Sequence, residues 1–159
     1  MSDRFAHDDE RAKTMLTILT PTFNRSDFLL RLLEYYKIMR CRYQILIGDS
    51  SIEPHAQTIK NAVERYQPFL NIMYKFYPGL NEPQATAQML DEVTTPYVTW
   101  IPDDDFLVMP SLGRSVSFLE QHADYTVAHG QAALFSLEQS GPYGRILADR
   151  KSTRLNSSH

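Results

Sequence analysis

The chain has 159 residues, of which 43% are hydrophobic and 22% charged, a size and composition typical of one globular domain with a substantial core. Its formal net charge of −3 gives no electrostatic basis for binding nucleic acid or an anionic membrane surface. Cys41 is the only cysteine, which excludes an internal disulfide and a metal site built from cysteines.

Short apolar runs alternate with stretches of helical periodicity from residue 14 onward. The first strand is predicted to stop at Pro21, which lacks a backbone N–H, and Ser26 or Asp27 is suited to cap the helix that follows. In chain order the predicted elements are strand 15–20, a helix that starts at 26 or 27, strand 43–48, helix 54–66, strand 70–76, helix 82–93, strand 97–101, helix 110–122 and strand 125–135.

This alternation predicts an α/β fold with a mostly parallel sheet that is covered by helices on both faces. Right-handed crossovers place the loops after the first, second and fourth strands at the same edge of the sheet. Those loops contain the polar clusters 22–25, 49–51 and 103–105. We therefore expect the three clusters to converge on one crevice, where open α/β sheets bind ligands.

Three consecutive carboxylates, Asp103, Asp104 and Asp105, follow the fourth strand. In an extended segment Asp103 and Asp105 share a face, and Asp104 points the other way. Their mutual repulsion falls if a hard divalent cation lies between them. The alternative interpretation is a solvated acidic turn without a ligand.

Several familiar sites are absent from the sequence. No Walker loop, no Gly-x-Gly-x-x-Gly after the first strand and no Gly-x-Ser-x-Gly elbow are present. The five histidines do not have the spacing of metal ligands. A P-loop enzyme, a dinucleotide-binding domain, an α/β-hydrolase and a histidine-based metal site are therefore not supported.

Three segments resemble motifs of the family 2 glycosyltransferases. Residues 19–25 look like their opening segment, residues 47–51 are similar to their second-strand segment, and residues 100–106, followed by Pro110, resemble their Asp-x-Asp motif. The resemblance covers about residues 14–136 in matching order. It implies a GT-A-type, nucleotide-diphospho-sugar transferase-like fold, a three-layer α/β/α sandwich with a mostly parallel sheet.

The resemblance also implies roles for individual residues. Pro21 and Thr22 would shape the loop under the nucleotide, and Asp49 would accept a hydrogen bond from a uracil or guanine N–H. Alternatively, Asp49 caps the turn or helix that follows it. Arg25 would pair with a phosphate or with a surface carboxylate. The implied nucleotide-binding residues are Pro21, Thr22, Asn24, Arg25, Asp49, Asp103 and Asp104.

The implied metal is Mn²⁺ or Mg²⁺. Asp105 would be the direct ligand, Asp103 would bind the ribose or the metal's water shell, and Asp104 is ambiguous because the triplet admits two registers. The cation would neutralise the charge that develops on the leaving diphosphate. The implied reaction is inverting transfer of a sugar from a UDP- or GDP-sugar to an acceptor hydroxyl, where the acceptor is a glycan, a lipid or a protein.

In such enzymes the catalytic base lies downstream of the region matched here, and residues 137–159 contain no counterpart of it. The chain is therefore expected to be the donor-binding half of a longer transferase, without transfer activity of its own. The other classes weighed are a sugar nucleotidyltransferase, which should have a Gly-rich basic loop after its first strand, and a non-catalytic or degenerate nucleotide-binding module.

The expected domain organisation follows from these patterns. Residues 1–13 are polar and expected to be disordered, 14–136 form the nucleotide-sugar-binding domain, 137–150 are a linker, and 151–159 resemble a non-native read-through tail. The first 13 residues lack a signal-peptide core, and no apolar run reaches the length of a membrane span. We expect a cytoplasmic protein, including one bound peripherally at the inner face of a membrane, with no nucleic-acid partner.

Overall fold

A computed structural model describes residues 14–138 and 141–147 of the chain. The chain divides into two compact units, Met1–Ala128 and His129–His159. The predicted disorder of residues 1–13 and the predicted tail at 151–159 lie outside the described residues.

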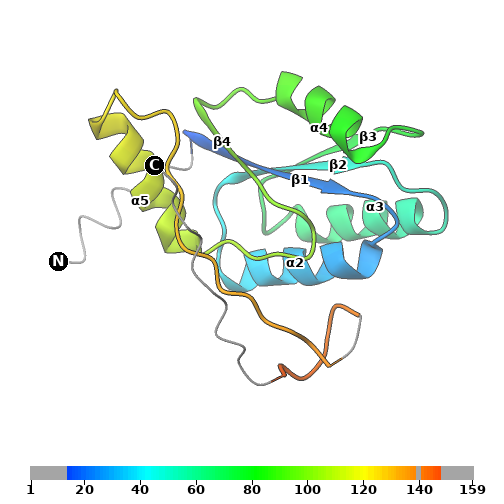
Figure 1. Cartoon of the computed structure of the whole chain (residues 1–159). Coiled ribbons are helices and arrows are strands. Elements are labelled where there is room, and N and C mark those ends of the chain that lie inside the picture. Colours follow the sequence, from blue (N-terminus) through cyan, green and yellow to red (C-terminus); the bar gives the residue numbers. More distant parts are fainter. Residues whose placement is uncertain (1–13, 139–140, 148–159) are drawn as a thin grey trace. The chain divides into compact units, whose positions relative to one another are not determined.

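The first unit is an α/β domain in which strands and helices alternate (Figure 1). Its strands form a four-stranded sheet of order β3-β2-β1-β4, and every neighbouring pair is parallel. The predicted α/β class and parallel sheet are confirmed. The elements are β1 (Leu16–Thr22), α2 (Ser26–Ile38), β2 (Gln44–Asp49), α3 (His55–Tyr66), β3 (Ile72–Phe76), α4 (Glu82–Asp91), β4 (Tyr97–Trp100) and α5 (Met109–Gln121).

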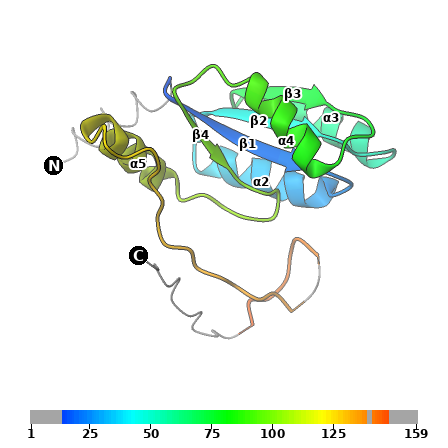
Figure 2. The same ribbon diagram turned by 45° about the horizontal axis from the view of Figure 1, so that its top comes forward.

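The helices cover both faces of the sheet, which gives three layers (Figure 2). On one face Ile18 and Ile47 belong to a large buried cluster with apolar residues of α2 and α3. On the other face Leu19 and Leu46 pack against Met89 of α4. Successive strand residues point to opposite faces, so the fully buried pattern of β1 reflects a central strand that is covered from both sides.

β1 runs two residues further than the sequence predicts, because Pro21 lies inside the strand instead of ending it. The pairing of β1 with β4 ends at Leu19. Leu19 O accepts from Ile101 N on the β4 side, and Thr22 O accepts from Ser50 N on the β2 side. Successive residues of β1 direct their backbone groups alternately to the two neighbouring strands, so the backbone nitrogen of Pro21 lies on the β4 side. Because the pairing with β4 has already ended there, the missing N–H removes no hydrogen bond of the sheet.

The start of α2 also differs from the prediction. The N-cap position is Arg25, and no side chain makes a capping hydrogen bond there. Ser26 is buried in the first turn, and its hydroxyl forms a hydrogen bond of 2.9 Å with Nδ1 of His55 at the start of α3. The serine therefore joins two helices, a use that its position in the sequence does not reveal.

The predicted fifth strand at 125–135 is wrong, since these described residues form no strand. A strand needs a neighbour for its backbone groups, whatever its side chains favour. Val127, Leu134 and Phe135 are between 68% and 70% exposed, so this apolar pattern is not packed as the prediction required.

The second unit contains a small antiparallel pairing within the region predicted as a linker. Leu137 and Ile146 form an isolated bridge, and Glu138 N donates to Arg145 O. The Arg145 and Glu138 side chains form an exposed ion pair of 3.4 Å. Among the described residues of both units, no helix has the length and apolarity that crossing a membrane requires.

Candidate functional site

The loops after β1 and β2 are tied together at the carboxyl edge of the sheet. Asn24 N donates to Ser51 Oγ at 2.8 Å, and Asn24 Oδ1 accepts from Ile52 N at 2.9 Å. Asn24 has a φ of 56°, a left-handed conformation that asparagine tolerates better than most residues. Its described contacts therefore shape the loop, and the predicted nucleotide contact of Asn24 stays a prediction.

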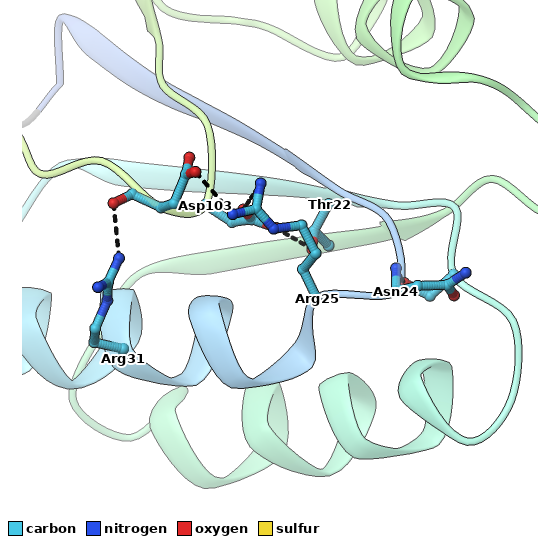
Figure 3. A network of polar contacts seen from close by, with 7 residues as sticks. Thr22, Asn24, Arg25, Arg31 and Asp103 are labelled. Carbon is cyan, nitrogen blue, oxygen red and sulfur yellow. Dashed lines mark hydrogen bonds and ion pairs between the residues drawn. The ribbon is translucent and has the colours of Figure 1, made fainter. Parts of the chain in front are cut away.

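The loop after β4 joins the same edge through Asp103. Thr22 Oγ1 donates to Asp103 Oδ2 at 2.7 Å, a buried hydrogen bond between the end of β1 and the loop after β4. Arg25 follows Thr22 closely and pairs with two carboxylates, at 3.2 Å to Asp103 and 2.7 Å to Asp104 (Figure 3). The predicted convergence of the three loops is thus confirmed by contacts between them.

The geometry of the aspartate triplet differs from the extended segment expected. Residues 103 and 104 form a turn, and Asp105 N lies 3.4 Å from Pro102 O. The turn brings Asp103 and Asp104 onto one guanidinium, while Asp105 is exposed. The prediction that Asp103 and Asp105 share a face is therefore wrong, because period-two alternation applies only to extended backbone.

Burial and charge act against each other at Asp103. The side chain is 3% exposed, and this desolvation raises the pKa of Asp103 despite the Thr22 hydrogen bond and the positive charge of Arg25. For Arg25 burial alone would lower the pKa, but the Asp104 hydrogen bond and the charges of Asp103, Asp104 and Asp105 raise it overall. The guanidinium is therefore firmly charged and is the main cation at these carboxylates.

Asp49 is completely buried at the end of β2. Its Oδ1 accepts from Ser51 N and its Oδ2 accepts from the Tyr74 hydroxyl, both at 2.8 Å. Burial, followed by this bond to Asp49, raises the pKa of Tyr74. The turn-capping role that the sequence allowed for Asp49 is therefore present, and the contact with a nucleobase stays a prediction.

Arg31 is a residue of the site that the sequence analysis missed. Its guanidinium (Figure 3) donates to Asp104 O at 2.7 Å. The same group lies 4.7 Å from the ring centroid of Phe106. Tyr35, one turn further along α2, donates to Leu107 O at 2.7 Å. Helical spacing of residues 31 and 35 was a signal in the sequence, but nothing in the sequence indicates that this face meets the aspartate turn.

Replacement of Arg31 by methionine is expected to lower the free energy of unfolding by about 1–2 kcal/mol. The variant loses a hydrogen bond from a charged donor and a cation–π contact, while the aliphatic bulk is retained. Urea denaturation measures the change. Arg31→Lys keeps the charge without the planar guanidinium, so its stability should fall between those of the parent and Arg31→Met. An unchanged midpoint for Arg31→Met would contradict the stabilising role of the Arg31 contacts.

A pocket of about 220 Å³ opens at this edge of the sheet. Its lining includes Thr22, Arg25, Ser50 and Asp103 from the three loops, with Glu82 from the first turn of α4. Pockets for drug-sized ligands usually measure about 300–1,000 Å³, so this one is large enough for only part of such a ligand. Pro21 also lines it, as does Phe23, which is 54% exposed.

The acidic residues here do not form a preassembled metal cage. Within residues 14–138 and 141–147, no group of three or more His, Cys, Asp or Glu side chains is arranged to hold a metal ion. The pair Asp103 and Asp104 nevertheless converges on a single cation, the Arg25 guanidinium.

Comparison with known proteins adds no family assignment. No protein-family model matches the chain, and a search of curated proteins finds no match.

Proposed function

We propose that this chain binds the nucleoside-diphosphate sugar of an inverting, metal-assisted glycosyltransferase and is the donor-binding half of that enzyme. The observation that carries the proposal is a buried carboxylate, Asp103, held by Thr22 and Arg25 beside a pocket at the carboxyl edge of a parallel sheet. Open α/β sheets bind ligands at this edge, and carboxylates with a guanidinium suit a metal-bound diphosphate.

The proposed metal is Mn²⁺ or Mg²⁺, for which carboxylate oxygens are suitable ligands. Asp103 and Asp104 already share one cation, the Arg25 guanidinium, and Asp105 is exposed at the end of the same turn. These oxygens would hold the ion, which when bound neutralises charge on the departing diphosphate. Arg25 would add a second positive charge toward the phosphates.

The GT-A form of the α/β fold is part of this proposal. It is supported by residues 19–25, 47–51 and 100–106, which follow β1, β2 and β4 or overlap their ends as the resemblance requires. The acceptor would be a glycan, a lipid or a protein. The proposed donor is a UDP- or GDP-sugar, with Asp49 reading the base if its carboxylate can accept a further hydrogen bond.

A second candidate is a nucleotide-binding module that uses no metal. The ion pairs of Arg25 with Asp103 and Asp104 favour it, because the carboxylates already have a counter-ion. Such a module would bind nucleoside diphosphates equally with and without Mn²⁺.

The test is a thermal-shift measurement with UDP and GDP, each with and without Mn²⁺. A ligand at 100 times its Kd stabilises the folded state by about 2.7 kcal/mol, roughly 5–10 °C in Tm for a chain of this length. We expect the full shift only with nucleotide and Mn²⁺ together. Asp105→Asn should abolish the metal-dependent part of the shift, because it removes the proposed direct ligand. The Asp105 side chain is exposed, so the substitution should not disturb the fold.

Asp124→Asn is the matched control, because it removes an exposed carboxylate outside the aspartate turn. It should behave like the parent chain. If Asp105→Asn also behaves like the parent, the metal role of Asp105 is wrong. If neither nucleotide shifts the parent with or without Mn²⁺, the donor-binding function is rejected.

A further inference from the structure

The aspartate turn already contains a cation, and that cation belongs to the protein. Arg25 NH1 lies 3.2 Å from Asp103 Oδ1, and Arg25 NH2 lies 2.7 Å from Asp104 Oδ2. A divalent ion and this guanidinium would compete for the same two carboxylates. A metal ion can therefore bind Asp103 and Asp104 only if Arg25 moves away from them.

The fit of Arg25 to Asp103 is incomplete. The whole Asp103 residue is 2% exposed, and no described residue makes a hydrogen bond to its Oδ1, although Arg25 NH1 is close. The contact is an ion pair without hydrogen-bond geometry. A buried carboxylate oxygen in this state is costly, whereas a metal ion imposes no donor direction and would satisfy it.

The Arg25 side chain has room to move away from the two carboxylates. Its side chain is 40% exposed, in contrast to the 3% of Asp103. Its guanidinium stacks 4.3 Å from the ring centroid of Phe28 and lines the pocket. The residue can therefore turn toward a ligand in the pocket without crossing the core.

We propose that Arg25 is an internal counter-ion that occupies the carboxylates of Asp103 and Asp104 until a divalent cation and a diphosphate arrive together. The metal takes the two carboxylates, and the diphosphate takes the released guanidinium. This inference rests on the proposed donor-binding function and adds to it a regulated order. Metal alone binds weakly because it must displace Arg25, and diphosphate removes that obstacle.

The proposal predicts a gain of metal binding on removing a positive charge. In Arg25→Gln, Mn²⁺ alone should bind about tenfold more tightly or better than in the parent. In the parent the Arg25 guanidinium and the ion would be about 4 Å apart, where two positive charges repel strongly. The enhancement of Mn²⁺ affinity by saturating UDP or GDP should shrink by a similar factor. Arg25→Lys keeps a cation and should leave Mn²⁺ binding weak.

Titration of the full chain with MnCl₂, followed by electron paramagnetic resonance of free Mn²⁺, measures these affinities without an activity assay. Arg114→Gln is the matched control, because it removes the same net charge at an exposed position of α5. Thermal melts of each variant identify any that fail to fold. If Arg25→Gln does not fold, tight binding of Mn²⁺ alone by Arg25→Lys would still contradict the proposal. The control should bind Mn²⁺ like the parent.

The outcomes separate this inference from the function on which it rests. Joint binding of Mn²⁺ and nucleotide to the parent, with no tighter Mn²⁺ binding in Arg25→Gln, overturns the counter-ion role and leaves the donor site intact. Equal gains in Arg25→Gln and Arg114→Gln also overturn it, since the effect is then net charge. Absence of joint binding in the parent rejects both proposals.

Discussion

Asp49→Ala is expected to lower the free energy of unfolding by about 3 kcal/mol. The buried carboxylate accepts from Ser51 N and from the Tyr74 hydroxyl. Its removal leaves a cavity and deprives the buried Ser51 N–H and the half-buried Tyr74 hydroxyl of their acceptor. Hydrogen bonds to charged groups each contribute about 1.5–3 kcal/mol, and relief of the carboxylate's own desolvation offsets part of the loss. Urea denaturation provides the measurement.

Tyr74→Phe is the control for this prediction. It removes one of the two bonds and keeps the charge and the turn at Ser51, so it should cost about 1–2 kcal/mol. If Asp49 also reads a base, Asp49→Ala should abolish nucleotide affinity, whereas Tyr74→Phe should retain it with one carboxylate oxygen freed. An Asp49→Ala variant with parental stability would contradict the buried role.

The second large effect is expected where α4 crosses the sheet. A Cβ added to Gly48 would lie 2.2 Å from Sδ of Met89, which is fully buried. Gly48→Ala should therefore cost about 1–3 kcal/mol through overpacking, and Met89→Ala alone about 2–5 kcal/mol through a cavity. Gly48 is an extended strand residue, so alanine is compatible with its backbone.

The two substitutions should not add. In the Met89→Ala background there is room for the new methyl group, so Gly48→Ala should be neutral or stabilise by a few tenths of a kcal/mol. A double-mutant cycle from urea denaturation tests this change of sign. Additive losses would mean that the sheet and helix do not meet at this point. Leu46→Val, on the same face, serves as a control with no expected sign change.

The order of strands and helices could be predicted because hydrophobic period and turn residues are local properties of the sequence. The failures share a different cause, which is that a residue's partner lies far along the chain. Pro21 was predicted to end β1, but β4 stops short of it and its missing N–H is harmless. The apolar run at 125–135 matches a strand, but strand formation depends on a neighbour.

The site shows the same division. Its location could be predicted, since parallel strands bring their carboxyl ends to one edge. The directions of the aspartate side chains could not be predicted, because Asp103 and Asp104 lie in a turn that contacts Arg25 at the N-cap of α2 and Arg31 within α2. Asn24 and Asp49 likewise form hydrogen bonds within the fold, and their predicted contacts with a nucleotide stay predictions.

The place of β1 in the sheet has a consequence for how the chain folds during synthesis. β1 leaves the ribosome before the other three strands of this sheet, yet it lies between β2 and β4 and is buried along its whole length. Its contact with the β4 side, as between Thr22 and Asp103, spans 81 residues of sequence. Contacts this distant form slowly, so one edge of this fully buried strand stays open until residue 100 has emerged. Nascent chains shorter than that should be the ones that chaperones bind.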